Sequence, residues 1–169
     1  MDETIVAGRR FGVTADTHDT LVDWPRLLAA LRDAWGDIDG VIHCGDITTA
    51  AALQALGAFG PVYATRSDDD PPAAPPELCD GPRVLNIGGV RIGLTFALPE
   101  PAKTADGATR LFGGPVAVCI YGGTHQAHVG QRDGMAYVNP GSPSLARQRT
   151  TAVLTVDGGR ASVELVELA

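Results

Sequence analysis

The chain has 169 residues, a length typical of one domain with a buried core, and we expect a single domain over residues 1–169. Its 44% hydrophobic and 20% charged residues exclude a disordered chain. The 13 Lys and Arg residues against 20 Asp and Glu residues give a formal net charge of −7, and the sequence shows no local basic patch. Nucleic-acid binding by electrostatic attraction is therefore not expected.

Two features bear on the cellular compartment. No apolar stretch reaches the roughly 18 residues of a membrane span, and the acidic residues 1–3 differ from the basic start of a signal peptide. Cys44, Cys79 and Cys119 are widely spaced and form no C-x-x-C pair, so we expect reduced thiols that fill the core. These observations predict a cytoplasmic protein that does not bind membranes.

The first half of the chain alternates short apolar runs with helical patterns. Leu27, Leu28 and Leu31 have helical spacing, Pro25 suits the start of a helix, and Gly36 suits its end. We expect strands at residues 11–14, 40–43 and 61–64 and helices at residues 24–35 and 49–56, the second helix stopping at Gly57. Strands and helices that alternate at this spacing indicate parallel strands with helical crossovers.

The second half consists mainly of short strands and turns. Residues 70–76, with the sequence DPPAAPP, predict a stiff connector. Strands are expected at 83–87, 91–96, 116–121, 135–138, 151–156 and 161–166, with turns at 88–89 and 157–159. Residues 98–114 show no readable motif and are expected to form a loop.

Side chains that can bind a metal directly follow four of the predicted strands. They are Asp16 and His18, Asp46, Asp68 with its acidic neighbours, and His125. Ligands of open α/β sheets bind beyond the carboxyl ends of the strands, so these residues can meet although they are far apart in the sequence. Carboxylates together with imidazoles suit manganese, iron or zinc better than calcium. Glycines at 45, 122, 123 and 141 would let the backbone approach a phosphate.

The same segments resemble the calcineurin-like metallophosphoesterases, specifically the small bacterial and archaeal phosphodiesterase group. The resemblance rests on D-T-H at 16–18, G-D at 45–46, R-S-D-x-D at 66–70, L-T-F at 94–96, G-G-T-H at 122–125 and N-P-G-S at 139–142, in the family's order. It covers residues 11–166. It implies a two-sheet α/β sandwich with flanking helices that hydrolyses phosphomonoesters or phosphodiesters at a two-metal centre.

This chain has every ligand of the family's first metal site but not every ligand of the second. The first metal site is complete, with Asp16, His18, Asp46 and His125 at the ligand positions. The second site shares Asp46 and would take the Asn of G-N-x-D, the His of L-T-H and the first His of G-H-T-H. These three positions hold Asp68, Phe96 and Gly123, of which only Asp68 offers a donor atom.

The resemblance therefore implies a metal-dependent phosphoesterase whose first site activates water for attack on the phosphorus of a small phosphoester. We expect Asp16, His18 and Asp46 to be catalytic, and Asp68 and Gly123 to contact the phosphate. One divalent ion is favoured over two. Mn²⁺ is expected, with Fe, Zn, Ni or Mg as alternatives. With a single ion, we expect the activity to be reduced rather than abolished.

Other interpretations stay open at this point. The altered second site also fits a binding or scaffold protein, for which the family offers a precedent in a retromer subunit, or a regulatory module that binds a nucleotide or phosphate without turnover. His43 is expected in the core and His128 exposed on a strand, although either could replace a missing ligand. Asp69 and Asp70 fit a solvated acidic turn. Exposed strand edges in the second half would suit a homodimer.

Overall fold

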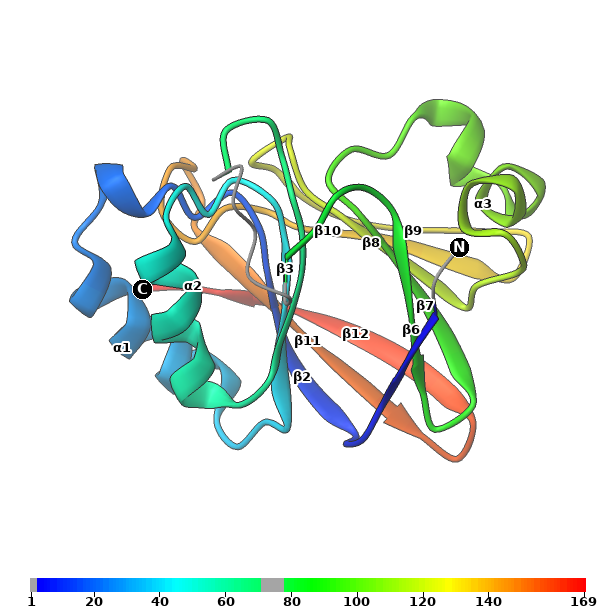
Figure 1. Ribbon diagram of the computed structural model, residues 1–169, viewed down its shortest axis with the longest axis horizontal. Coiled ribbons are helices and arrows are strands. Elements are labelled where there is room, and N and C mark those ends of the chain that lie inside the picture. Colours follow the sequence, from blue (N-terminus) through cyan, green and yellow to red (C-terminus); the bar gives the residue numbers. More distant parts are fainter. Residues whose placement is uncertain (1–2, 71–77) are drawn as a thin grey trace.

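Two six-stranded β-sheets lie face to face, with helices on both outer faces (Figure 1). The structure is a computed structural model, and it describes residues 3–70 and 78–169. Sheet I has the order β12-β11-β2-β3-β4-β5 and contains β2 (Arg10–Thr14), β3 (Gly40–Cys44), β4 (Val62–Thr65), β5 (Leu78–Cys79), β11 (Thr150–Asp157) and β12 (Arg160–Glu167). Sheet II has the order β1-β6-β7-β8-β10-β9 and contains β1 (Glu3–Val6), β6 (Arg83–Ile87), β7 (Val90–Thr95), β8 (Val118–Tyr121), β9 (Ala127–Arg132) and β10 (Met135–Pro140).

Parallel strands lie in the middle of both sheets. In sheet I, β2 to β5 run parallel, and β11 and β12 add an antiparallel pair beside β2. In sheet II, β7, β8 and β10 run parallel. The parallel arrangement expected for the first half of the chain is confirmed, and it places the carboxyl ends of β2, β3 and β4 along one edge.

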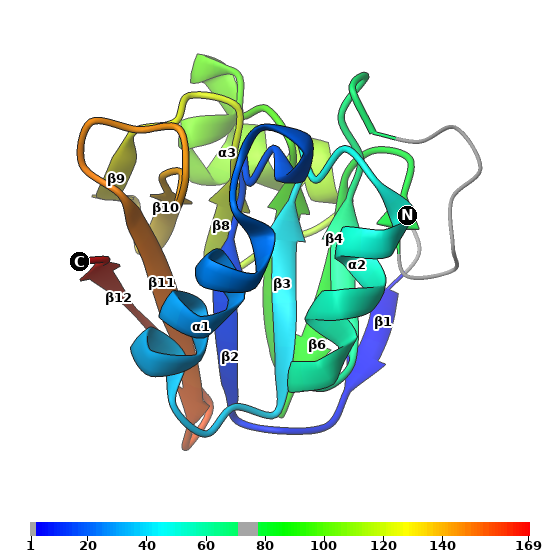
Figure 2. The same cartoon turned by 90° about the vertical axis from the view of Figure 1, so that its left-hand side faces the viewer.

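The helices lie on the outer faces of the sheets. α1 (Trp24–Trp35) and α2 (Ala50–Leu56) cover sheet I, and α3 (Ala105–Phe112) covers sheet II (Figures 1 and 2). Three 3₁₀ turns complete the description: η1 (Asp19–Leu21), η2 (Gly57–Phe59) and η3 (Glu100–Lys103). The predicted two-sheet sandwich with flanking helices is therefore confirmed.

Helix α1 shows how the sequence determines one of these layers. The Asp23 side chain accepts a hydrogen bond from the backbone N–H of Arg26, and Gly36 caps the opposite end. Trp35 lies so close to β2 that a Cβ atom at Gly12 would lie 2.4 Å from the indole ring. The indole N–H donates to the Thr151 hydroxyl of β11 at 2.9 Å. The ring therefore fixes the helix across two strands of sheet I.

Three apolar clusters fill the spaces between the layers. The largest lies between the sheets and includes Val13 and Ile42 of sheet I and Leu85, Ile92 and Ile120 of sheet II. A second cluster joins α1 and α2 to sheet I, and a third joins α3 to sheet II. Two sheets that each bury both faces in this way form a four-layer fold.

The structure corrects the expectation that residues 98–114 form a loop, because they contain η3 and α3. Thr104 caps α3 by accepting from the backbone N–H of Gly107 at 3.1 Å, and Ala108 and Phe112 bury its inner face. Gly107 obscured this helix in the sequence because glycine disfavours helices. A Cβ at this position would lie 1.7 Å from the Pro101 carbonyl oxygen, so the close turn requires glycine.

Smaller differences concern the ends of elements. Strands β1 and β5 were not predicted. Helix α2 ends at Leu56 with Gly57 as its C-cap, as predicted, and the 3₁₀ turn η2 follows it directly. The predicted connector lies outside the described residues except for Asp70. Cys44 and Cys119 are buried free thiols, as expected, and the side chain of Cys79 lies outside the described part. Among the described helices, none combines the length and apolar character of a membrane span.

Candidate metal centre

The loops after β2, β3 and β8 meet at the upper edge of the sandwich in Figure 2. Asp16 and His18 follow β2, and Asp46 follows β3, so these three residues come from sheet I. His125 follows β8 and comes from sheet II. The candidate site therefore lies where the two sheets converge, as the positions of these residues at strand ends predict.

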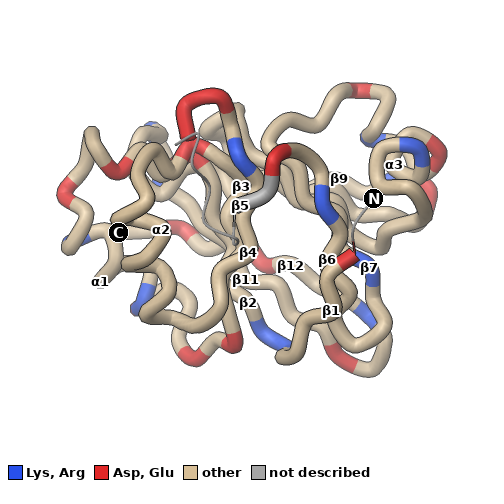
Figure 3. The backbone as a smooth tube through the Cα atoms, viewed as in Figure 1, with Lys and Arg blue, Asp and Glu red and all other residues tan. Residues whose placement is uncertain are grey.

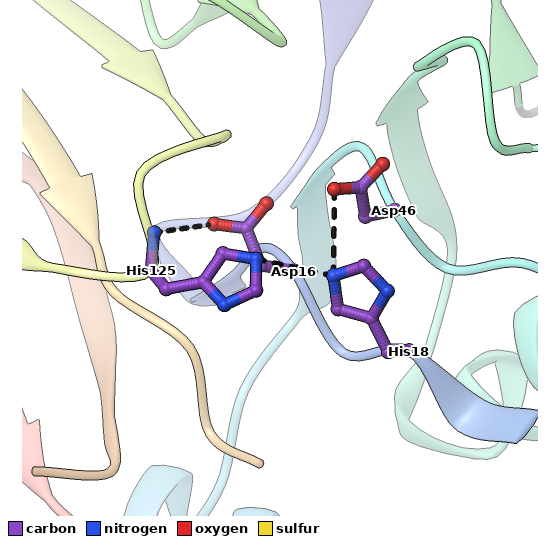
Figure 4. Close-up of side chains that lie close together, drawn as sticks. All are labelled: Asp16, His18, Asp46 and His125. Carbon is purple, nitrogen blue, oxygen red and sulfur yellow. Dashed lines mark hydrogen bonds and ion pairs between the residues drawn. The ribbon is translucent and has the colours of Figure 1, made fainter. Parts of the chain in front are cut away.

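Four side chains converge there, as Figure 4 shows. One ligand atom from each of Asp16, His18, Asp46 and His125 lies within 4.8 Å of the others. The Nε2 atoms of His18 and His125 are 3.2 Å apart, and His18 Nε2 is 3.4 Å from Asp46 Oδ2. Donor atoms bound to one ion at about 2.1 Å lie roughly 3.0 to 3.4 Å from each other. The two measured spacings therefore fit ligands that share a single divalent cation, and the whole set lies close enough to close around one ion with small side-chain movements.

Backbone groups of the opposite sheet hold the Asp16 carboxylate. The backbone N–H of Gly123 donates to both carboxylate oxygens, at 2.9 and 3.0 Å, and that of His125 donates to Oδ2 at 3.2 Å. The residue is fully buried, and this burial raises the pKa of the Asp16 carboxyl while the two N–H groups oppose the shift. A buried carboxylate beside a second one, Asp46, calls for a cation to balance the charge.

A buried acidic residue, Asp70, fixes the loop that carries Asp46. Its carboxylate accepts from the backbone N–H groups of Asp46 at 3.0 Å, Ile47 at 2.6 Å, Thr48 at 2.8 Å and Ser67 at 2.9 Å. Four donors on one carboxylate determine the path of the loop. Asp70 is therefore a buried structural anchor, and the expectation of a solvated acidic turn is wrong for this residue. The side chains of Asp68 and Asp69 are exposed.

The neighbouring residue Ser67 contacts Asp46 itself. The Ser67 hydroxyl donates to Asp46 Oδ1 and lies 3.2 Å from the Asp46 backbone nitrogen. The other oxygen, Oδ2, faces His18. The two carboxylate oxygens of Asp46 therefore have different partners, and only Oδ2 is directed at the cluster.

All four clustered residues adopt a left-handed backbone conformation. The φ angles are 51° at Asp16, 45° at His18, 59° at Asp46 and 58° at His125. This region is uncommon for residues other than glycine and costs on the order of 1–3 kcal/mol each. Such strain persists because the surrounding hydrogen bonds determine the loops, and it is concentrated at functional sites.

Gly122 lets the loop from sheet II reach sheet I. A Cβ there would lie 2.3 Å from the carbonyl oxygen of Cys44 and 2.8 Å from Cβ of Ala15. The side-chain amide of Asn139 donates to the Gly122 carbonyl at 3.2 Å, and the Ser142 hydroxyl donates to the Asp16 carbonyl at 2.7 Å. The N-P-G-S segment at 139–142 thus holds both sides of the junction.

At the positions of the family's second metal, Phe96 fills space. A Cβ on Gly45 would lie 2.2 Å from the Phe96 ring, and one on Gly123 would lie 3.3 Å from it. The structure does not bring Asp68 into the four-residue cluster. The other two histidines also lie apart from it among the described residues, with His43 buried in β3 and His128 exposed on β9, as expected.

Sequence reasoning missed the residues that support the cluster. Asp70, Ser67, Asn139 and Ser142 act through hydrogen bonds between loops, and such bonds leave no periodic pattern in the sequence. Two signals pointed to these segments: both resemble motifs of the family, and both lie at strand ends, with 66–70 after β4 and 139–142 at the end of β10.

Comparison with known proteins identifies the family. The calcineurin-like phosphoesterase superfamily domain model matches residues 10–159, which include all four clustered residues. The chain belongs to this superfamily. It is 29% identical over 163 residues to a probable metallophosphoesterase of Methanothermobacter thermautotrophicus, covering 92% of this chain and 90% of that protein. The family expected from the sequence is confirmed.

Solved structures of other proteins share the two-sheet sandwich. An archaeal phosphodiesterase aligns with a TM-score of 0.71 at 20% identity, covering 93% of this chain and 99% of its own. Vps29 of Chaetomium thermophilum aligns with a TM-score of 0.73 at 20% identity, covering 94% and 96%. At this level of identity the two structures establish the fold alone.

Replacing Asp70 by asparagine should weaken metal binding. An amide retains one acceptor oxygen for four N–H donors, so the loop carrying Asp46 loosens, and we expect the Mn²⁺ affinity to fall by about 10- to 100-fold in isothermal titration calorimetry. Asp69→Asn, an exposed neighbour with the same charge change, should bind Mn²⁺ as the unmodified protein does. Equal affinities for the two variants would contradict the anchoring role of Asp70.

Acid should destabilise the metal-free protein through His43. Burial lowers the pKa of His43 to about 4, against the opposing carboxylates of Asp70 and Asp19. Between pH 6.5 and about 4 the unfolded chain binds a proton at His43 that the folded chain refuses, so stability falls as pH falls, by roughly 3 kcal/mol across the window. Urea unfolding in EDTA at pH 7 and pH 5 should show about 2 kcal/mol of this loss, because pH 5 lies inside the window. His43→Gln should lose less stability between these two pH values, and an identical loss would refute the prediction.

Proposed function

We propose that the protein is a metal-dependent phosphoesterase that works with one bound ion. The observation that carries the proposal is the convergence of two carboxylates and two imidazoles from both sheets at spacings that suit one ion. Asp16, His18, Asp46 and His125 would hold the ion. A divalent cation bound there supplies Lewis-acid polarisation of a phosphoryl oxygen and a water of lowered pKa. The membership of the chain in the phosphoesterase superfamily supports this assignment.

The residues of the chain prepare the site in three ways. Gly123 and His125 hold the Asp16 carboxylate through backbone N–H groups, so it need not reorganise during the reaction. Ser67 and Asp70 fix Asp46. Gly123 is exposed and carries no side chain, so its backbone is accessible to a substrate, and its phosphate contact stays a prediction.

Two residues, Ser67 and Phe96, support one ion over two. The Ser67 hydroxyl donates to Asp46 Oδ1, so this oxygen already has a partner and is less available to a second ion. The Phe96 ring lies against Gly45 and Gly123 and offers no donor atom. The predicted contributions of Asp68 to a metal or a phosphate stay predictions, since its side chain is exposed.

The charge of the centre favours phosphodiesters as substrates. Asp16 and Asp46 carry two negative charges, which a divalent ion balances, so the loaded centre is about neutral. A phosphodiester carries one negative charge, whereas a phosphomonoester carries between 1.5 and 2 at neutral pH, roughly. A neutral centre accepts the smaller charge at the lower electrostatic cost. Mn²⁺ is our choice of ion because the donors combine carboxylates and imidazoles.

Hydrolysis of bis(p-nitrophenyl) phosphate in Mn²⁺ tests the proposal. We expect turnover with about one ion per chain, and Asp16→Asn should reduce it by roughly a hundredfold or more because the ligand is weakened. Metal content is measured on the same samples. A metal-loaded protein without turnover on this diester or on p-nitrophenyl phosphate would reject the enzyme assignment.

Restoring the second site is a separate test. Phe96→His together with Gly123→His should raise the metal content towards two ions and increase turnover, because both lost donors return. Both variants bear the cost of a side chain at a φ of 81°, and Gly123→His alone should be the less stable of the two because its new Cβ would lie 3.3 Å from the Phe96 ring, which the double variant replaces. A double variant that still holds one ion would show that these positions do not limit occupancy.

A scaffold function is the second candidate. The observation that favours it is the pair Phe96 and Gly123, together with the similarity of the fold to Vps29. On this hypothesis the ion is structural, the double variant gains no activity, and the protein acts through a protein partner.

The cytoplasmic location and the homodimer expected from the sequence also stay predictions.

A further inference from the structure

A cleft of about 850 Å³ opens beside the metal centre. His125 belongs to its lining, so the cleft adjoins the cluster of ligand atoms. The remaining lining residues come from three segments: Thr124, Gln126 and Ala127 before and in β9; Leu145, Ala146, Arg147 and Gln148 before β11; and Glu167 at the end of β12. A volume of this size suits a small organic molecule.

Both long walls of the cleft are tied to the metal-binding loops. On one side, the Thr124 hydroxyl accepts from the side-chain amide of Asn139 at 3.0 Å. On the other side, the Ser144 hydroxyl donates to the Thr17 carbonyl at 2.7 Å, and Leu145 donates its backbone N–H to the Ser142 hydroxyl at 3.0 Å. The cleft is therefore held in a fixed position relative to Asp16 and His125.

The side chains of the lining differ in chemistry. Leu145 is 40% exposed and offers an apolar surface. Arg147 is exposed and is the one cationic side chain among the described lining residues. Glu167 is the one anionic side chain among them, and it accepts a hydrogen bond from Gln148 at 3.1 Å. An apolar surface beside a guanidinium is suited to an organic group that carries an anionic substituent.

We propose that this cleft binds the organic part of the phosphoester, and that Arg147 pairs with a second anionic group on it. The proposal rests on the proposed function, because it places the scissile phosphate at the metal centre. The loaded centre is about neutral, so it offers little attraction for a second anion. The protein as a whole carries a net charge of −7, with acidic and basic residues spread over the whole backbone (Figure 3), and this net charge repels a second anion. Arg147 is thus the group of the cleft that can select such substrates.

Binding of two nucleotides to the Mn²⁺-loaded protein tests the proposal. Adenosine 3′,5′-bisphosphate carries a second phosphate that adenosine 5′-monophosphate lacks, and both offer the same base to Leu145. In isothermal titration calorimetry we expect the bisphosphate to bind about tenfold more tightly. Arg147→Ala should reduce this preference to nearly none, and Arg147→Lys should retain part of it because the charge remains without the planar fork.

Arg160→Ala is the matched control. Arg160 is also exposed but begins β12, at the end of the strand opposite Glu167, so this variant should keep the full preference. A preference that survives in Arg147→Ala, or falls equally in Arg160→Ala, overturns the proposal.

Hydrolysis of bis(p-nitrophenyl) phosphate by the same unmodified sample separates this proposal from the proposed function. If the sample hydrolyses the diester but its preference for the bisphosphate does not depend on Arg147, the proposal for the cleft is rejected and the phosphoesterase assignment stands. An Arg147-dependent preference without turnover supports the cleft and rejects the phosphoesterase.

Discussion

The contact between the Asp16 carboxylate and the backbone N–H groups of Gly123 and His125 joins the two sheets at the site. Asp16 follows β2 in sheet I, and its two donors follow β8 in sheet II. The contact is only feasible because Gly122 has no side chain, which lets the two loops touch. Since His125 lies within this same contact, the interaction that aligns the sheets also places one imidazole beside the others. The contact that aligns the two sheets therefore also brings the metal ligands together.

The site is built on loops that are unfavourable in isolation. All four residues of the cluster adopt positive φ, and two carboxylates lie buried beside each other. The compensation comes from hydrogen bonds that do not touch the ligand atoms of the cluster, namely those of Asp70, Ser142 and Asn139. These surrounding hydrogen bonds hold the four cluster side chains in positions that become favourable when a cation is bound.

The strands β2, β3 and β4 and the helices α1 and α2 could be predicted because each is a continuous run with one period. The predicted helix at Trp24–Trp35 is correct at both ends, since Pro25 marks its start and Gly36 its end. Helix α3 was missed because a tertiary contact with Pro101 places glycine within a short helix. The convergence of Asp16, His18, Asp46 and His125 could be predicted because each follows a strand directly. Asp70 could not be distinguished from Asp68 and Asp69, because only the fold determines which of three adjacent carboxylates turns inward.

The four residues of the cluster lie in two different sheets and are separated by up to 109 positions along the chain, as the distance from Asp16 to His125 shows. They come together only in the folded state, so an ion that binds them has no comparable site in the unfolded chain. Each tenfold excess of free ion over its dissociation constant then adds about 1.4 kcal/mol to the free energy of unfolding. The supply of divalent metal in the cell would therefore set the lifetime of this protein as well as its activity, and metal starvation would lower its abundance through unfolding and degradation.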